Sequence, residues 1–353
     1  MKLLFIGEAW LGSCAKSLME SLDRIEEIEI IQLNEEQFFK KRHNIFNRIV
    51  NRLFYDRQIK VLNKEVLRNI ESFKPNAVVV YKGSHINKEL LDRIKEKGCL
   101  TVNIYPDLSP HGHSASHKIA VGVYDLVIST KVFHPEKWQN TYGYSNECLF
   151  VPQGYDPELH LSPFQPHRFG PDVALVATYR REYGDLMLEL AEQIKDANLS
   201  VVIGGNGWDV IRGKFPTSWR VEGPVIGQAY IDLLKSSKIC IAPLTTKIYI
   251  QGKSQPGDVD TTRSYELAAA NCFFIHRRTE YMQKLYDEIL EVPMFNDAKE
   301  LAEHIMFFLE NESLRNQMAR AAHNRAVPNY SLDYRAKEIV EILGNKLNKN
   351  VKN

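Results

Sequence analysis

The chain has 353 residues, of which 44% are hydrophobic and 25% charged, and its formal net charge is +1. This composition is typical of a soluble globular protein and excludes disordered and fibrous classes, while the near-neutral charge argues against a general nucleic-acid-binding protein. At about 150 residues per domain the length predicts two domains, and no run of about 18 uncharged apolar residues is present that could span a membrane.

The first half of the chain alternates short apolar strands with amphipathic helices, a pattern typical of a parallel sheet covered by helices on both faces. Strands are expected at residues 2–7, 27–33, 76–83, 99–105 and 124–130, and helices at 13–25 and 87–97. Because Glu8 interrupts the first apolar run and charge returns at Lys16, that run is expected to be a buried strand rather than a signal peptide. Five cysteines without a close pair predict reduced thiols in a cytoplasmic protein and no zinc site.

The segment from Phe38 to Arg68 is strongly basic. Nine Lys or Arg residues against two acidic ones give it a charge of +7, which leaves −6 for the rest of the chain. Apolar residues recur in it at helical spacing, at Ile45, Ile49 and Leu53, so an amphipathic basic helix is expected. Two interpretations stay open. The helix either faces the core with a solvated basic back, or contacts an anionic membrane surface or an anionic acceptor.

The second half repeats the alternation after a stretch rich in Pro, Gly and His between Pro152 and Pro171, which is the expected linker. Strands are expected at 172–178, 199–205, 238–244 and 272–276, and helices at 183–197, 231–237, 262–270 and 334–343, the last ended by Gly344. The sequence therefore predicts an α/β protein with two Rossmann-like, doubly wound parallel-sheet domains that face a cleft. Their expected bounds are 1–155 and 156–330, and residues 331–353 form a helix expected to pack back on the N-terminal domain.

Ligands of such sheets bind where the carboxyl ends of the strands meet. In the second half, the first strand ends at Arg180 and Arg181, whose permanently charged, forked guanidiniums suit phosphate. Further on, Asp258 precedes an expected helix and Glu266 lies just over one turn into it. The residues that lead into this helix between the two acids include Thr261, Thr262 and Arg263. Because the first amides of a helix lack intrahelical partners, a diphosphate is expected there, flanked by the two carboxylates.

Two acids separated by seven residues and followed by Leu-Ala-Ala-Ala-Asn and an apolar strand resemble the donor-site signature of retaining GT-B glycosyltransferases (glycosyl transferases group 1). The segment VEGPVIGQAYIDLLKSSKICIAPL at 221–244 is similar to the one that these enzymes place over the nucleotide base. VPQGYDPELH at 151–160 resembles the interdomain stretch of their CgeB-like branch. The likeness covers most of residues 150–330, whereas residues 1–150 agree in architecture only.

This resemblance implies a GT-B enzyme that transfers a sugar from a nucleotide-diphosphate sugar, with a UDP-sugar as the expected donor. The acceptor would be a glycan or a lipid-linked molecule in surface polysaccharide or glycoconjugate synthesis, bound by the N-terminal domain. The implied roles in the donor domain are ribose binding by Glu266, sugar binding by Asp258, diphosphate binding by Arg180 and Arg181, leaving-group neutralisation by Arg181, and base binding around Gly223 and Val225. Arg263 or Lys253 would replace the second cation that the family usually places beside the first arginine.

Neither a cofactor nor a metal is expected, because helix amides and arginines can hold a diphosphate unaided. Asp258-Val259-Asp260 also spells an Asp-x-Asp metal motif, which is the alternative. Glu266 could instead be a first-turn acid that interacts with the helix dipole, and Asp260 or Thr262 could be a helix N-cap.

The acceptor hydroxyl is expected near Gly12, Asp107 and His111 of the first half. Attack on the face of the leaving group, common in this family, needs no protein nucleophile, and Asp107 as a base is the alternative. Two other functions stay open, a nucleotide-sugar epimerase of the same architecture and a non-catalytic nucleotide-sugar-binding protein. If the basic helix contacts a membrane, the protein is expected at its inner, cytoplasmic face.

Overall fold

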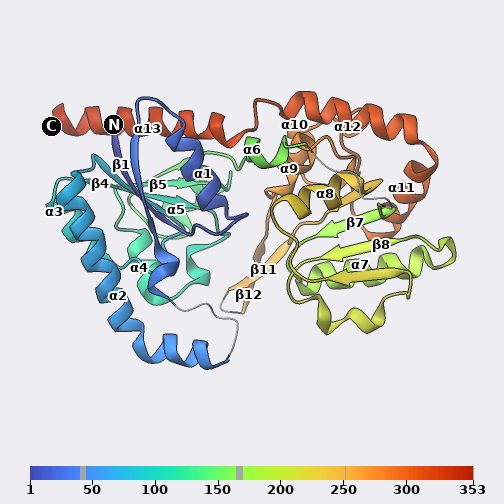
Figure 1. The fold of residues 1–353 in the computed structure, drawn as a ribbon, viewed down its shortest axis with the longest axis horizontal. Helices are drawn as coiled ribbons and strands as arrows, with labels where there is room; N and C mark the ends of the chain where they lie inside the picture. The colour runs from blue at the N-terminus through green and yellow to red at the C-terminus, as the bar shows by residue number, and fades with distance from the viewer. Residues whose placement is uncertain (40–44, 164–169, 251, 353) are drawn as a thin grey trace. The chain divides into compact units, whose positions relative to one another are not determined.

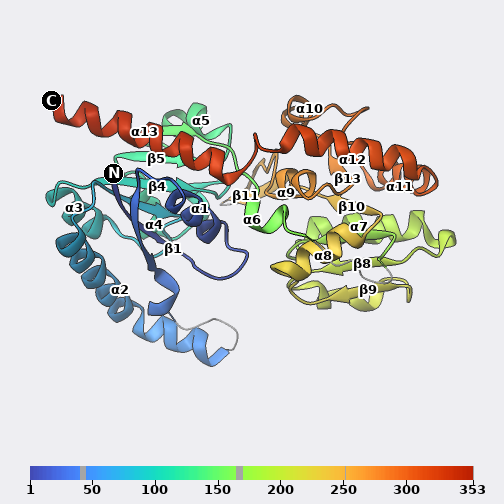
Figure 2. The ribbon, with the colours of Figure 1, turned by 45° about the horizontal axis from the view of Figure 1, so that its top comes forward.

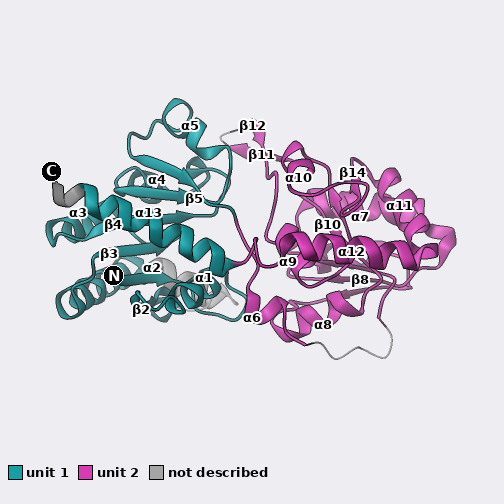
Figure 3. Ribbon diagram, turned by 90° about the horizontal axis from the view of Figure 1, so that it is seen from above, with its two compact units in different colours: residues 1–152, 332–353 teal, residues 153–331 magenta. Residues whose placement is uncertain are grey.

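The structure, a computed structural model, describes residues 1–39, 45–163, 170–250 and 252–352 (Figure 1). The chain divides into two compact units (Figure 3). Unit 1 comprises Met1–Pro152 and Leu332–Asn353, and unit 2 comprises Gln153–Ser331. The C-terminal helix α13 (Leu332–Lys352) is thus part of unit 1. The units divide after residues 152 and 331, where the sequence predicted boundaries after residues 155 and 330.

Unit 1 contains a six-stranded sheet in the order β2-β1-β3-β4-β5-β6, and all neighbouring strands are parallel. The strands are β1 (Lys2–Gly7), β2 (Glu29–Asn34), β3 (Ala77–Tyr81), β4 (Leu100–Tyr105), β5 (Leu126–Ser129) and β6 (Glu147–Phe150). Side chains of a strand alternate between its two faces, so the buried run of β1 supplies both cores. Leu4 and Ile6 belong to one hydrophobic cluster, and Leu3 and Phe5 belong to the other.

Helices cover both faces of this sheet. The first cluster contains residues from α2 (Ile45–Phe73), α3 (Lys88–Glu96), α4 (Ala115–Val121) and α5 (His134–Asn140). The second cluster contains residues from α1 (Cys14–Asp23) and α13, which lie side by side (Figure 2). The predicted doubly wound parallel sheet is therefore confirmed in unit 1.

Unit 2 contains a second six-stranded parallel sheet, in the order β14-β13-β10-β7-β8-β9. Its strands are β7 (Val173–Val176), β8 (Val201–Gly204), β9 (Trp219–Glu222), β10 (Ile239–Ala242), β13 (Phe274–Arg277) and β14 (Met294–Phe295). On β10, Ile239 and Ile241 enter one core cluster, whereas Cys240 and Ala242 enter another. Both faces are again covered, so the predicted fold class is confirmed for this unit too.

The helices of unit 2 divide between those two clusters. One face packs against α7 (Arg181–Gln193), α11 (Ala298–Glu310) and part of α12 (Glu312–Ala326). The other packs against α8 (Gln228–Ser236), α9 (Arg263–Ala269), α10 (Glu280–Leu285) and the end of α12. A short helix, α6 (Pro157–His160), precedes the sheet, and a two-stranded antiparallel hairpin, β11 (Lys247–Ile250) and β12 (Lys253–Pro256), follows β10.

Two expectations about helices need correction. The C-terminal helix does not end at Gly344 but continues to Lys352. Burial of Leu343 in the core of unit 1 outweighs the cost of about 1 kcal/mol that one glycine inside a helix brings. In α2, Leu53 is 73% exposed, so at this residue the interpretation of a core-facing helix is wrong, whereas the alternative of a surface contact stays open. The buried side of α2 is formed instead by Ile59, Leu62, Val66, Leu67 and Ile70.

The expected helix and its basic residues are only partly described. Lys40, Lys41 and Arg42 lie outside the described residues, as do the side chains of Ile45, Phe46, Arg48, Ile49, Val50 and Arg52. Within the described part of α2, Arg57, Lys60, Lys64 and Arg68 are all exposed. Among the helices of the ranges given above, none is both long enough and apolar enough to span a membrane.

Candidate functional site

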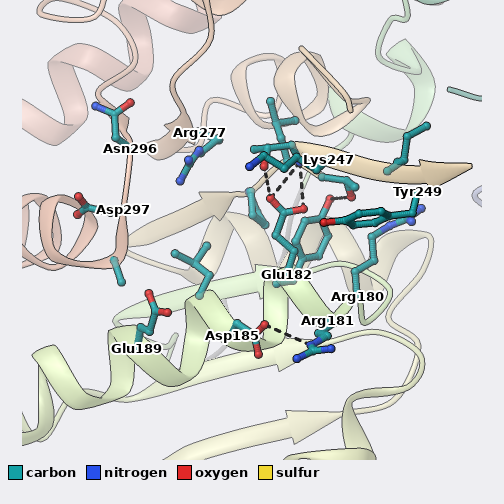
Figure 4. A pocket seen from close by; sticks show the side chains of 18 residues that line it. Arg180, Arg181, Glu182, Asp185, Glu189, Lys247, Tyr249, Arg277, Asn296 and Asp297 are labelled. Atoms are coloured by element: carbon teal, nitrogen blue, oxygen red, sulfur yellow. Dashed lines mark hydrogen bonds and ion pairs between the residues drawn. The ribbon is translucent and has the colours of Figure 1, made fainter. Parts of the chain in front are cut away.

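Loops at the carboxyl edge of the unit 2 sheet enclose an open cavity of about 1040 Å³. They follow β7, β10 and β14, and Arg277 at the end of β13 also lines the cavity; these four strands are neighbours in the sheet. In Figure 4, Glu182 lies at the centre of this cavity, with Arg180 and Arg181 on one side and Arg277 on the other. Its basic residues are Arg180, Arg181, Lys247 and Arg277, and its acidic residues are Glu182, Asp185, Glu189 and Asp297. Because basic and acidic residues are equal in number, the position of each charge in the cavity determines where an anionic ligand can bind.

The two predicted phosphate-binding arginines lie at the start of α7. Arg180 has extended backbone at the N-cap position, and Arg181 is the first helical residue. The Arg181 side chain is 92% exposed, and its Nε lies 3.7 Å from Oδ2 of Asp185, one turn further on. The first amides of a helix have no intrahelical partners, so a phosphate at this end would meet both amides and guanidiniums.

Glu182 joins the start of α7 to the loop that follows β10. Both of its carboxylate oxygens lie 3.0 Å from the backbone nitrogen of Thr246, which donates to them, and the Thr246 hydroxyl also donates to Oε1. The carboxylate is therefore satisfied by protein donors although it lines the cavity. The same loop holds the segment with the first predicted acid, because Asp258 N donates to Thr245 O at 2.8 Å. A side chain at Gly257 would meet Thr245 O at 1.8 Å, so only glycine fits there.

The turn before α9 is fixed from inside the unit. The Ser264 hydroxyl accepts a hydrogen bond from Thr261 N at 3.0 Å and lies 2.8 Å from His276 Nε2. Burial lowers the pKa of His276 to about 4, so this histidine is neutral at physiological pH. Its Nδ1 lies 2.7 Å from Arg277 O, a carbonyl that can only accept, so Nε2 accepts from Ser264.

The amides expected to receive a diphosphate at α9 are largely used inside the turn. Ser264 N donates to Thr261 O, and both Tyr265 N and Glu266 N donate to Thr262 O. Thr262 has helical backbone and makes no side-chain capping bond, so it is not the N-cap that the sequence left open. The expectation of free amides is therefore wrong for Ser264, Tyr265 and Glu266. The longer α7 offers its N-terminus in their place.

Of the two aspartates of the Asp-x-Asp motif, Asp260 is buried and accepts a hydrogen bond from the Tyr265 hydroxyl at 2.6 Å. Asp258 is partly exposed. Among the described residues, no group of three or more His, Cys, Asp or Glu side chains is arranged to hold a metal ion.

Glu266 is held by two side chains from elsewhere in unit 2. Its Oε2 accepts a hydrogen bond from the Tyr230 hydroxyl at 2.8 Å, and its Oε1 lies 3.9 Å from Nε2 of His160. One turn earlier on α9, Arg263 donates to the carbonyl of Pro243 at 3.3 Å, and Pro243 lines the cavity. Arg263 therefore lies against the cavity wall, with Glu266 on the same face of the helix. The alternative cation, Lys253, is exposed on β12, whereas Lys247 of β11 lines the cavity.

Gly223 and Val225, predicted to lie near the nucleotide base, follow β9. The Gly223 carbonyl accepts from Gly205 N at 2.9 Å, and a Cβ on Gly204 would lie 2.9 Å from Cγ2 of Val225. Both residues therefore lie at the carboxyl ends of β8 and β9, on the same edge of the sheet as the cavity.

In unit 1, Gly12 lies between β1 and α1 with φ near +90°, a conformation that favours glycine. It leads directly into Ser13, whose hydroxyl accepts from Ala15 N and caps α1. The chain therefore needs glycine here to start the helix, whatever ligand is bound.

Asp107 follows β4 and lies in a charged cluster. Its Oδ2 is 3.1 Å from Nε2 of His113 and 3.5 Å from Nζ of Lys82. Burial raises the pKa of Asp107, but the hydrogen bond and charge of His113 together with Lys82 outweigh it, so the net pKa lies below its usual value. His111, which the sequence placed with Asp107 near the acceptor hydroxyl, has its Nε2 3.3 Å from the carbonyl of Tyr142. The structure thus brings His113, rather than His111, to Asp107.

Around the Lys82–Gly83 turn, unit 1 buries further polar groups. Lys82 has φ of +61°, uncommon for a residue other than glycine. His117 Nδ1 donates to Gly83 O at 3.0 Å, and a Cβ on Gly83 would lie 3.0 Å from the Tyr124 hydroxyl. Glu35 follows β2, and burial, then Glu8, raises its pKa to about 7 against the opposing charge of Lys82. This polar cluster lies at the carboxyl edge of the unit 1 sheet.

Sequence reasoning missed Tyr230 and His160, the two residues that hold Glu266. Tyr230 occupies a position in α8 that apolar spacing assigns to the core, and His160 lies within the stretch expected to be a linker. No local signal distinguishes either residue. Lys82 and His113 had one signal, since Lys82 lies at the end of one predicted strand and His113 follows another.

Comparison with known proteins adds a partial match to a family model and a fold. Residues 180–341 match the family model described as "Glycosyl transferase-like". No curated protein matches the chain.

Several solved structures resemble it over nearly their whole length. Sucrose-phosphate synthase from Thermosynechococcus elongatus has a TM-score of 0.70 at 10% identity, covering 99% of this chain and 100% of that one. HepE from Anabaena in complex with UDP has a TM-score of 0.65 at 12% identity, covering 98% and 100%. A protein described as a putative UDP-N-acetylglucosamine 2-epimerase from Listeria monocytogenes has a TM-score of 0.60 at 10% identity, covering 99% and 97%.

The chain has the GT-B fold. Its two parallel six-stranded sheets and the likeness to these structures show this. The family match includes the Arg180–Arg181 pair, the hairpin and α9, which contribute to the cavity or its wall.

Proposed function

We propose that this protein is a glycosyltransferase that takes its sugar from a UDP-sugar bound in unit 2. The observation on which the proposal rests is the cavity at the carboxyl edge of the unit 2 sheet, where Arg180 and Arg181 flank the N-terminus of α7. Guanidiniums and helix amides at one point are suited to a diphosphate. The match of residues 180–341 to a glycosyl transferase-like family, and solved relatives of the same fold in complex with UDP and with UDP-glucose, support this choice of ligand.

In the proposed reaction, the bond between the anomeric carbon and the diphosphate breaks, and the acceptor oxygen bonds to that carbon. Arg180, Arg181 and the α7 amides neutralise the charge that grows on the departing diphosphate. Glu266 binds the ribose hydroxyls and Asp258 contacts the sugar. We propose retention of the anomeric configuration, as in the group 1 transferases and their CgeB-like branch that the sequence resembles, with the leaving diphosphate taking the acceptor proton. We propose no metal and no cofactor in this step.

The proposed acceptor is a glycan or lipid-linked hydroxyl bound by unit 1, in surface polysaccharide or glycoconjugate synthesis. Polar groups at the carboxyl edge of the unit 1 sheet support this, since His113 and Lys82 both lie within 3.5 Å of Oδ2 of Asp107 in one charged cluster. If a base takes part, Asp107 is the proposed residue, because its lowered pKa keeps it ionised.

The exposed face of α2 supports contact with an anionic membrane surface at the cytoplasmic side. Phe54 is 49% exposed, and with Leu53 it lies near the exposed Arg57, Lys60 and Lys64. Apolar and basic side chains together on one helix are the combination that holds peripheral helices on anionic lipid.

Calorimetric titration with UDP and with uridine tests the donor site. Replacing Arg180 and Arg181 together with Gln is expected to weaken UDP binding by roughly 1.5–3 kcal/mol, because the lost hydrogen bonds are charge-assisted. Uridine binding should stay unchanged, since uridine has no phosphate. Arg212→Gln is the matched control, because Arg212 is an exposed arginine of the same unit paired with Asp209 at 2.8 Å. Equal losses for UDP and uridine, or no loss, would contradict the proposed phosphate site.

An epimerase of the same fold is the second candidate, because solved relatives with that description resemble the chain. Incubation with a UDP-sugar separates the two. A transferase releases UDP faster when an acceptor is added, whereas an epimerase inverts one sugar carbon without any acceptor. A nucleotide-sugar-binding protein without activity would bind UDP and give neither product.

A further inference from the structure

A buried histidine and a buried tyrosine converge on Glu266 from separate helices. Tyr230 comes from α8 and His160 from α6, and their rings are nearly perpendicular, with centroids 6.2 Å apart. Tyr230 is 8% exposed and His160 3% exposed, whereas the Glu266 side chain retains 16% exposure. The two residues therefore lie behind the carboxylate, and the carboxylate alone presents a surface to a ligand.

Tyr230 fixes one oxygen of Glu266. Burial, then the charge of Glu266, raises the pKa of Tyr230 well above its ordinary value, so the hydroxyl keeps its proton and donates to Oε2. A carboxylate oxygen has two lone pairs, so Oε2 can still accept one hydrogen bond from a ligand. The hydrogen bond from Tyr230 therefore restricts rotation of the Glu266 carboxylate and leaves Oε2 able to accept a hydrogen bond from a ligand.

His160 faces the other oxygen. Its Nε2 is buried, has no hydrogen-bond partner, and lies 3.9 Å from Oε1, beyond hydrogen-bond length but within ion-pair range. Its Nδ1 lies 3.1 Å from the donating Asp156 N and 2.9 Å from Asp156 O. In the tautomer with the proton on Nε2, Nδ1 accepts from Asp156 N and the Nε2 proton faces Oε1 of Glu266.

The two helices are tied together next to these residues. The Ser162 hydroxyl and the Gln228 side chain form a hydrogen bond of 3.2 Å, and Gln228 Nε2 donates to Pro163 O. Lys235 Nζ, on the same helix as Tyr230, donates to Ser162 O at 2.9 Å. His160 and Tyr230 are therefore held in place before any ligand arrives, which is the condition for a precise binding group.

We propose that His160 and Tyr230 are positioning residues that set the Glu266 carboxylate for a vicinal pair of ribose hydroxyls, and so determine the preference for ribonucleotides. This inference rests on the proposed function, in which Glu266 contacts the ribose. Neither residue touches the nucleotide, so removing either affects only the part of the affinity that depends on the hydroxyls.

The test compares the affinities for UDP and for 2′,3′-dideoxy-UDP, measured by calorimetry. The wild type is expected to prefer UDP by at least about 10-fold, as for hydrogen bonds to a charged group. Tyr230→Phe and His160→Leu should each reduce that preference several-fold and leave the dideoxy affinity within about twofold. His160→Gln, which can keep a donor near Nε2, should retain the preference.

Two control variants lose comparable interactions elsewhere. Tyr144→Phe removes a partly buried tyrosine bond of 2.9 Å to Lys118 O in unit 1, and His304→Gln alters a histidine that also lies 3.9 Å from a glutamate, Glu300. Both should keep the ribose preference.

The possible results distinguish failure of the positioning role from failure of the proposed function. If UDP and dideoxy-UDP affinities fall by the same factor in a variant, the role of that residue is only structural and the inference is overturned. An unchanged preference overturns it equally. If the wild type binds UDP and dideoxy-UDP equally well, Glu266 does not bind the ribose hydroxyls. If the wild type binds neither nucleotide, the proposed function is overturned. The inference fails in both cases.

Discussion

Replacing Glu35 with Gln is expected to remove a pH dependence of stability from unit 1. Glu35 is 5% exposed, and its Oε2 is buried without a hydrogen-bond partner. Burial, then the charge of Glu8, raises its pKa from 4.5 to about 7, although Lys82 opposes the shift. The folded state therefore binds this proton more tightly than the unfolded state does. The neutral carboxyl stabilises the fold fully below pH 4.5, and this contribution is lost as pH rises through about 7.

The size of the effect follows from the two pKa values. Their difference corresponds to roughly 3 kcal/mol at about 1.4 kcal/mol per pH unit. In urea denaturation, the wild type should lose about this much free energy of unfolding relative to Glu35→Gln between pH 4.5 and pH values above 7. Gln stays neutral throughout, so the variant should become the more stable protein at high pH.

The control for this experiment is Glu96→Gln at the exposed end of α3, which should change stability equally at both pH values. If the curves of wild type and Glu35→Gln run parallel from pH 4.5 to above 7, Glu35 is ionised throughout and the argument from burial is refuted.

Three further predictions concern the proposed function. Glu266→Ala should weaken UDP binding by roughly 1.5–3 kcal/mol in calorimetry without unfolding the chain, and an unchanged affinity would remove Glu266 from the site. UDP binding and transfer should survive EDTA, whereas loss on chelation with rescue by manganese or magnesium would support the Asp-x-Asp alternative. Anionic vesicles should sediment the protein in a salt-sensitive way and neutral ones should not, at about 1 kcal/mol per well-placed cation. Reversing the charges of Arg57, Lys60 and Lys64 should abolish this binding and leave UDP affinity intact, and absence of vesicle binding at low salt would make α2 a solvated face.

The central strands could be predicted from the sequence, whereas the edge strands β6, β9 and β14 could not. β1 and β3 are buried on both faces, so they are continuous apolar runs that stand out in the sequence. β6 and β9 lie at the edges of their sheets and are partly exposed, with the sequences ECLF and WRVE. Their polar residues hide the strand signal. A strand shows a weak apolar pattern when it lies at the edge of a sheet, and the local sequence does not reveal which strands lie at an edge.

The candidate site was predictable in its location but not in its internal contacts. Arg180 and Arg181 could be found because the carboxyl end of a strand is a local feature. The partners of Glu266 could not, since Tyr230 is 36 residues away in the chain and pairs with it only through the packing of α8 on α9. The same limit explains His113. Both His111 and His113 follow β4, and only the path of the loop decides which of them reaches Asp107.

The two carboxyl edges differ in a way that bears on which substrate each unit binds. In unit 2, the paired Arg180 and Arg181 lie at a helix N-terminus, where positive potential and forked donors coincide. In unit 1, the edge gathers the carboxylates of Asp107 and Glu35 around Lys82. A phosphate at that edge would face at least one ionised carboxylate, whereas a sugar hydroxyl would find acceptors for its proton. We therefore expect the anionic donor to bind unit 2 and a hydroxyl-bearing acceptor to bind the edge of unit 1. An anionic group on that acceptor, if it has one, would be held by the basic face of α2 and not by the sheet edge.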